Sequence, residues 1–226
     1  MERCWSGPDV LYHFHGVPSV VVDQVERAGL HIVARVINEG TLSDDYTRAW
    51  ARPGAFARLM NDTRRRIEMY CEHGVHIDRV ALSSFSAGFA AVQQILSDGR
   101  AARRIDGVLL EDSLYAGYSD PQRKVLSPKG LSPFLSFARA SVEGDKLMAI
   151  THSEIRTPAY ASTRETADYL LRELGLVRKP PSSGKGTEAS DGNFWLRGLP
   201  GRDAAAHARH LQHMGETVLV RLAQFW

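Results

Sequence analysis

Short apolar runs alternate with longer stretches of helical periodicity along the whole chain. An apolar run of roughly four to eight residues is typical of a buried strand, whereas apolar positions recurring every three or four residues are typical of a helix. We predict strands at residues 10–14, 31–37, 79–84, 105–111, 146–151 and 194–197. We predict helices at residues 18–28, 54–72, 86–97, 133–142, 162–174 and 203–225. This alternation predicts an α/β fold with a doubly wound sheet of about six mainly parallel strands and helices on both faces.

Two stretches interrupt this rhythm. Residues 38–53 form a long connection, and because connections of this length are often functional, we expect Tyr46 and Trp50 to line a pocket there. Residues 177–193 (VRKPPSSGKGTEASDGN) are rich in Pro, Gly and Ser, which predicts a flexible surface insertion. Apart from that insertion, we expect residues 1–226 to form a single domain.

The amino-acid composition argues against several classes of protein. The chain is 43% hydrophobic, which supplies a sizeable core and argues against disorder. With 28 Lys+Arg against 26 Asp+Glu the net charge is +2, so we expect no nucleic-acid partner. The two cysteines, Cys4 and Cys71, form no metal-type cluster, so we expect no metal site and a reducing, cytoplasmic location. No apolar run reaches about 18 residues, and we expect neither a membrane span nor a signal peptide.

The sharpest chemical signal is VALSSFSAGFAAVQQIL, residues 80–96, in which an apolar strand turns directly into a helix. At such a junction the middle residue is forced into a strained conformation that lifts its side chain above the sheet. Ser86 occupies that place, and small residues two positions before and after it keep the turn from clashing. The backbone N–H of Ala87, at the start of the following helix, would face a developing oxyanion.

These residues resemble the nucleophile elbow of the α/β-hydrolase superfamily, which reads GxSxG where this chain reads SxSxG with Ser84 first. The resemblance extends from about Asp9 to the end of the chain, without the superfamily's usual first two strands. It implies a trimmed hydrolase fold without a separate cap domain, unless residues 38–53 and 113–133 act as lids, and it implies no cofactor. The alternative interpretation of Ser86 is an ordinary helix N-cap.

A second oxyanion donor is implied by the same resemblance. The first strand ends in His15-Gly16-Val17, and a His-Gly pair in this place supplies the backbone N–H of the next residue, here Val17. Glycine lets the backbone approach a substrate closely. The alternative for Gly16 is a simple strand-to-helix turn. We expect His15, Gly16 and Phe85 to border the pocket.

A serine nucleophile requires a base. Three histidines, His207, His210 and His213, occur in the last predicted helix, and their spacing places neighbours roughly 60° apart on its surface. They therefore cannot all face one site. We choose His207 as the base because it lies nearest the sheet edge and the start of the helix, with His210 as the alternative.

The orienting acid has two candidates. Asp112 follows directly on the strand GVLLE, whereas Glu154 follows the next strand, after which the resembled superfamily more often places its acid. We prefer Asp112 because a carboxylate at a sheet edge with no intervening residue needs a partner such as His207. His152 is expected to shape the pocket.

Together these features predict a serine hydrolase that acts on a small-molecule carboxylic ester through Ser86, His207 and Asp112. The alternative is a non-catalytic binding or scaffold protein with a hydrolase-derived fold. A doubly wound protein that binds an anion at the helix after Ser86 is less favoured, since no glycine-rich phosphate loop follows the first strand. The pattern sets neither the acyl size, nor ester against amide preference, nor the oligomeric state.

Overall fold

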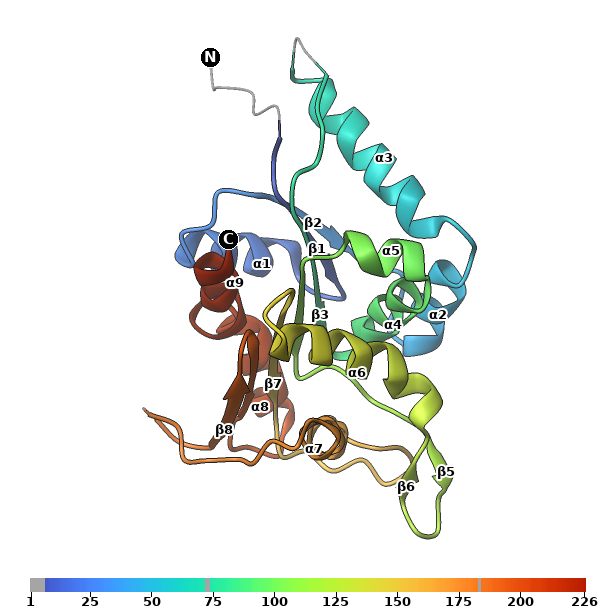
Figure 1. The fold of residues 1–226 in the computed structure, drawn as a ribbon, viewed down its shortest axis with the longest axis vertical. Coiled ribbons are helices and arrows are strands. Elements are labelled where there is room, and N and C mark those ends of the chain that lie inside the picture. Colours follow the sequence, from blue (N-terminus) through green and yellow to red (C-terminus); the bar gives the residue numbers. More distant parts are fainter. Residues whose placement is uncertain (1–6, 72–73, 183) are drawn as a thin grey trace.

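A seven-stranded sheet forms the centre of the computed structural model, which describes residues 7–71, 74–182 and 184–226 (Figure 1). Its strands are β1 (Val10–Phe14), β2 (Val33–Ile37), β3 (Val80–Phe85), β4 (Gly107–Glu111), β7 (Leu147–His152), β8 (Thr187–Asp191) and β9 (Phe194–Gly198). They lie in the order β2-β1-β3-β4-β7-β9-β8, and all neighbours are parallel except β8 and β9. The predicted mainly parallel α/β fold is confirmed, with one strand more than the six expected.

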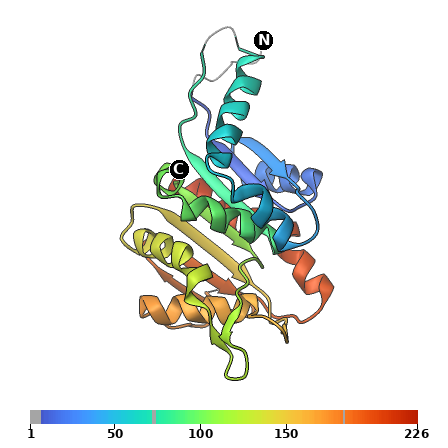
Figure 2. The same ribbon diagram turned by 90° about the vertical axis from the view of Figure 1, so that its right-hand side faces the viewer.

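Helices cover both faces of this sheet. One face carries α1 (Pro18–Arg27), α8 (Ala204–Gln212), a π-helix (Gly215–Leu219) and α9 (Val220–Phe225). The other face carries α2 (Ser43–Trp50), α3 (Ala55–Glu68), α4 (Phe89–Ser97), α5 (Gly99–Arg104), α6 (Pro128–Val142) and α7 (Thr163–Leu174). A short hairpin of β5 (Tyr118–Asp120) and β6 (Val125–Leu126) extends from one end of the molecule and α3 from the other (Figure 2).

The strands read as nearly continuous apolar runs because both faces of the sheet are buried. Successive side chains of a strand point to opposite faces. Leu11 therefore packs in the layer with α1 and α9, whereas its neighbour Tyr12 packs on the other face, against Phe56 and Thr63 of α3. The same alternation separates Leu109 from Leu110 on β4. The carboxyl ends of β3 and β4 consequently meet at one edge, where the chain turns into the candidate site.

Several elements, the hairpin strands β5 and β6 among them, lie where the sequence interpretation expected none. The connection at residues 38–53 contains α2, in which Tyr46 and Trp50, four residues apart, form one buried helix face. The expected insertion at residues 177–193 contributes β8, which pairs antiparallel with β9. Helix α5 begins at a cap formed by Asp98, whose side chain accepts hydrogen bonds from two backbone N–H groups.

Helix boundaries also differ. Helix α6 begins at Pro128, five residues before the expected start, and contains Pro133. Proline cannot donate to the preceding turn, and the Ser132 hydroxyl donates to the carbonyl of Lys129 at 3.3 Å instead. The expected helix at residues 203–225 is divided by the π-helix. Helix α3 ends at Glu68, and residue 72, its expected end, lies outside the described residues.

Two observations bear on the expected location of the protein. None of the helices within residues 7–71, 74–182 and 184–226 has the length and apolar character needed to cross a bilayer. Cys71 is disulfide-bonded, so the cysteine content does not support the expected reducing location. Cys4 lies outside the described residues.

Candidate active site

Ser86 lies at the junction of β3 and α4, in a single 3₁₀ turn, Ser86–Gly88. Its φ is 50°, an uncommon value for a residue with a side chain, and the conformation costs on the order of 1 kcal/mol or more. Gly88 is needed two residues later because a Cβ there would lie 2.1 Å from the backbone carbonyl oxygen of Phe14. The strained turn expected at Ser86 is therefore present.

Ser84, which stands where the superfamily motif has glycine, is fully buried and takes part in a hydroxyl chain. The hydroxyl of Ser113, just after β4, lies 2.9 Å from that of Ser84 and donates to the carbonyl of Ser86 at 2.9 Å. Ser84 therefore donates to Ser113. Through these hydrogen bonds Ser84, the residue that departs from the motif, connects the turn at Ser86 with the loop after β4.

Asp112 follows β4 with φ of 44° and is fully buried. One carboxylate oxygen lies 2.7 Å from Nδ1 of His207, and the other accepts hydrogen bonds from the backbone N–H of Ser153 (2.8 Å) and the hydroxyl of Thr163 (2.6 Å). Burial alone raises the pKa of Asp112, but the contact with His207, the nearby His210 ring and these donors outweigh burial and lower it below its ordinary value. Asp112 is therefore a carboxylate at neutral pH.

His207 lies on α8, whose first turn is capped by Asp203 accepting from the backbone N–H of Ala206 at 2.7 Å. Because its Nδ1 faces Asp112, its Nε2 points away from that carboxylate. The ring of Phe85, the residue before Ser86, stacks on His207 with ring centroids 4.4 Å apart. The imidazole thus lies beside the turn that carries Ser86, although no hydrogen bond joins it to the Ser86 hydroxyl in the described part of the chain.

The two alternative residues have other partners. His210 is buried and bonded to the hydroxyl of Thr151 at 2.8 Å, and burial lowers its pKa to about 4. Glu154 forms ion pairs with Arg164 (3.5 Å) and Arg202 (3.6 Å). The structure therefore pairs His207 with Asp112 and leaves both alternatives with other partners.

The loop after β1 is fixed by an amide pair. Asn38 accepts from the N–H of Gly16 at 3.0 Å and donates to its carbonyl at 2.9 Å. Val17 is the N-cap of α1, and Ala87 lies in the first turn after β3, so both N–H groups belong to helix starts, where donors lack intrahelical acceptors. The interpretation of these two groups as oxyanion donors stays a prediction. Sequence reasoning missed Asn38.

The described residues that line the cavity next to Ser86 do not include the expected pocket residues His15, Gly16, Tyr46, Trp50 and Phe85. His15 stacks on Phe85 with ring centroids 6.2 Å apart, and its Nδ1 lies 2.9 Å from the Tyr46 hydroxyl. Tyr46 is fully buried in the core, so its expected place in a pocket is wrong, although its hydroxyl contacts His15. Trp50 likewise packs in the core, against Phe14 at 5.0 Å. Its expected place in a pocket is wrong, because the connection that carries it folds as a helix with Trp50 on the buried face.

His152 is also not at the pocket. It is buried, its Nδ1 lies 2.8 Å from the carbonyl of Ser153, and a Cβ at Gly198 would meet its ring at 2.7 Å. The strand β7 runs one residue further than expected and takes His152 into the sheet. Burial lowers its pKa to about 4.

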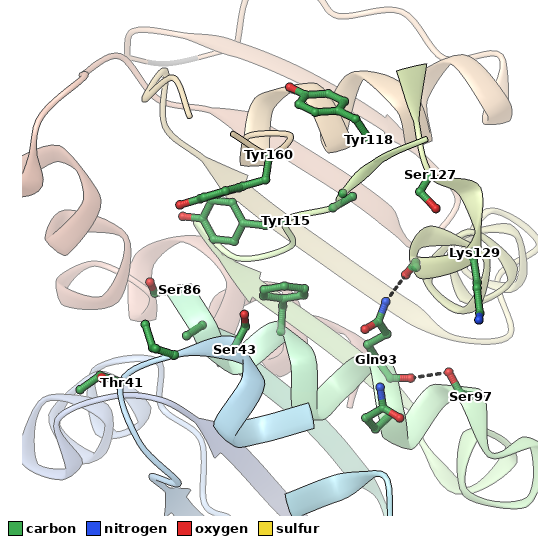
Figure 3. Close-up of a pocket in the computed structure, with 17 residues that line it drawn as sticks. Thr41, Ser43, Ser86, Gln93, Ser97, Tyr115, Tyr118, Ser127, Lys129 and Tyr160 are labelled. Carbon is green, nitrogen blue, oxygen red and sulfur yellow. Dashed lines mark hydrogen bonds between the residues drawn. The ribbon is translucent and has the colours of Figure 1, made fainter. Parts of the chain in front are cut away.

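A cavity of about 910 Å³ opens from Ser86 and Ala87 (Figure 3). Tyr115 and Tyr160 lie over the Ser86 end with their rings 5.5 Å apart. Burial, and then the charge of Asp112, raise the pKa of Tyr115, so it stays a neutral hydroxyl. Sequence reasoning missed both tyrosines, although Tyr115 comes only three residues after Asp112.

A buried polar chain crosses three strands beneath the site. Nδ1 of His13 lies 2.8 Å from the Ser83 hydroxyl, which donates to the Glu111 carboxyl group at 3.0 Å. Burial raises the pKa of Glu111 well above its ordinary value and lowers that of His13 to about 3, so both groups are neutral. Nε2 of His13 has no hydrogen-bond partner among the described residues and lies under Gly16, where a Cβ would meet it at 2.6 Å.

No family model and no curated protein matches the chain. Among solved structures, it is similar to the lin2722 gene product of Listeria innocua, with 13% identity, a TM-score of 0.52, and coverage of 98% of this chain and 93% of that one. It is also similar to the enterobactin hydrolase IroE in complex with DFP, with 16% identity, a TM-score of 0.41, and coverage of 93% and 83%. At these identities a likeness shows the fold alone. The chain therefore shares with the Listeria innocua protein an α/β fold, a mainly parallel sheet with helices on both faces.

Proposed function

We propose that this protein is a serine hydrolase that cleaves carboxylic esters of small molecules. The observation that carries the proposal is the 2.7 Å contact between His207 and the buried Asp112, beside a strained turn that presents Ser86 to a cavity. An imidazole oriented by a buried carboxylate, next to a serine on such a turn, is the arrangement that activates a hydroxyl.

The proposed reaction has two steps. Oγ of Ser86 attacks the carbonyl carbon while Nε2 of His207 accepts the hydroxyl proton and the N–H groups of Ala87 and Val17 stabilise the oxyanion. The alcohol leaves with the proton from His207. A water molecule, deprotonated by His207, then attacks the acyl group on Ser86, which releases the acid and restores the serine. Asp112 fixes the tautomer with a proton on Nδ1 and stabilises the imidazolium.

The test is labelling by a fluorophosphonate together with hydrolysis of p-nitrophenyl esters. We expect the wild-type protein to be labelled at Ser86 and to be active, and Ser86→Ala to lose both. Ser190→Ala, at an exposed position of β8, is the matched control and should retain both. Absence of labelling in the wild type, or equal activity in Ser86→Ala, would contradict the proposal.

A second candidate is a binding protein that has the fold without the catalysis. The observation that favours it is the lack of a hydrogen bond between the Ser86 hydroxyl and His207, although such bonds often tighten only when substrate is bound. In this case a fluorophosphonate would not label Ser86, whereas small carboxylic esters would still bind in the cavity without being hydrolysed.

A further inference from the structure

The cavity that starts at Ser86 extends between α4 and the beginning of α6. Gln93 and Ser97 line it from α4, and Lys129 and Gly130 line it from α6. Figure 3 shows Ser86 on the left of the view and Lys129 with Ser97 on the right. A ligand whose carbonyl lies at Ser86 would therefore reach the end occupied by Lys129 with its far part.

The two helices are fixed to each other at that far end. The side-chain amide of Gln93 donates to the carbonyl of Gly130 at 2.6 Å, and a Cβ at Gly130 would meet the same nitrogen at 2.8 Å. A Cβ at Gly130 would therefore displace the Gln93 amide from this position. The contact holds the first turn of α6, with Lys129, against α4, so the far wall of the cavity is part of the folded framework.

The charge contributed by the described side chains that line the cavity is positive. Lys129 is the charged residue among those that line it, and no acidic side chain lines it within the described parts of the chain. Lys129 forms no ion pair among the described residues, unlike Lys146, which pairs with Asp106 at 3.8 Å. Lys129 also lies in the first turn of α6, where the helix dipole favours negative charge.

We propose that the preferred substrates are esters that carry a carboxylate in addition to the ester group. This carboxylate belongs to the part of the molecule that lies along the cavity. The proposal rests on the proposed function, because it places the scissile carbonyl at Ser86. The ammonium group of Lys129 attracts the carboxylate, while the neutral hydroxyl and amide groups along the cavity solvate the connecting chain. Monoesters of dicarboxylic acids have this chemistry.

The experiment compares p-nitrophenyl hydrogen dodecanedioate with its methyl ester, because α4 alone rises about 12 Å between Phe89 and Ser97 and a shorter chain would not reach Lys129. A second pair, 10-acetoxydecanoate and its methyl ester, carries the carboxylate on the alcohol side. In at least one pair we expect kcat/KM to be about tenfold higher for the anionic member, mostly through KM, because a charged hydrogen bond in a cleft has roughly this effect. The preference should decrease in about 1 M salt, where the screening length is about 3 Å.

Variants connect this preference to Lys129. We expect Lys129→Met to reduce the anionic-to-neutral ratio of kcat/KM to about one and Lys129→Glu to reverse it, whereas Lys129→Arg should retain it. Lys185→Met, at an exposed lysine away from the cavity, is the matched control and should retain both the ratio and the basal activity.

The outcomes separate the two proposals. If the wild type shows no anionic preference in either pair, or if Lys129→Met retains it, the substrate class is wrong, while hydrolysis of the neutral esters that depends on Ser86 would leave the proposed function intact. If no ester is hydrolysed and Ser86 is not labelled, both proposals are overturned.

Discussion

At the scale of single residues, the site is organised around one buried carboxylate. Asp112 accepts hydrogen bonds from a backbone N–H, a hydroxyl and an imidazole, all donated by segments that follow it in the chain. A buried charge without such partners would be costly. Its ionised form is therefore maintained by Ser153, Thr163 and His207 together.

Replacing Asp112 by Asn removes the charge and favours the wrong tautomer of His207. We expect kcat for p-nitrophenyl esters to decrease by about 10⁴, as is typical when the acid of such a triad is neutralised. Steady-state kinetics with circular dichroism of both proteins is the measurement. Glu154→Gln, which removes the surface carboxylate after β7, serves as the control and should leave kcat unchanged.

The chain formed by His13, Ser83 and Glu111 makes a separate prediction about stability. Ser83→Ala leaves two fully buried polar groups without their shared partner. We expect the free energy of unfolding to decrease by about 1–3 kcal/mol in urea denaturation. The exposed Ser190→Ala should change it by less than about 0.5 kcal/mol. Equal stability of the two variants would show that the chain contributes nothing.

At the scale of elements, the turn between β3 and α4 is held by a close backbone approach and by hydroxyl groups. Gly88 lies against the carbonyl of Phe14 on β1, and the chain of Ser84 and Ser113 joins the turn to the loop after β4. The candidate nucleophile is consequently supported by both neighbouring strands of the sheet.

Gly88→Ala tests this support. The added Cβ would meet a backbone oxygen at 2.1 Å, so the turn or β1 must shift. We expect the variant to lose about 1–3 kcal/mol of stability and to be labelled more slowly at Ser86 by a fluorophosphonate. Gly99→Ala, where the nearest atom lies 3.8 Å away in a helix, should be neutral or slightly stabilising. Wild-type labelling and stability in Gly88→Ala would contradict the account of this turn.

The sequence predicted the elements whose signal is local and missed those whose signal depends on neighbours. Strands such as β4 are apolar over most of their length, and the turn at Ser86 follows from small residues at fixed spacing, so both were recognised. The strand β8 has the polar sequence TEASD and forms because β9 offers an open edge. Asp112 was likewise preferred because it directly follows a strand, whereas Tyr115, Tyr160 and Lys129 line one cavity only in the folded chain.

At the scale of the whole molecule, several imidazoles are buried in the neutral form. Burial lowers the pKa of His152 and His210 to about 4 and that of His13 to about 3. The unfolded chain binds protons at these residues near pH 6.5, where the folded chain does not. The raised pKa of Glu111 has the opposite effect on the pH dependence of stability, but Glu111 is a single group and these imidazoles are three.

We therefore expect the free energy of unfolding to decrease as the pH falls from 6.5 towards 4. Each of these imidazoles contributes about 1–2 kcal/mol of that decrease between pH 6.5 and about pH 5. Urea denaturation over this range is the measurement. His210→Gln removes one titrating group and should flatten the dependence, and the exposed His213→Gln should leave it unchanged. Constant stability of the wild type between pH 6.5 and 5 would contradict this reading of the buried histidines.

The contact between Asp112 and His207 joins positions 95 residues apart in the chain. During synthesis the strand that carries the acid emerges long before the helix that carries the imidazole, and β7 and β9 must be inserted into the sheet between these events. A growing polypeptide can thus form its serine turn early yet has no general base to use there. Under the proposed function, activity towards esters therefore requires that α8 has been synthesised and has packed against the sheet.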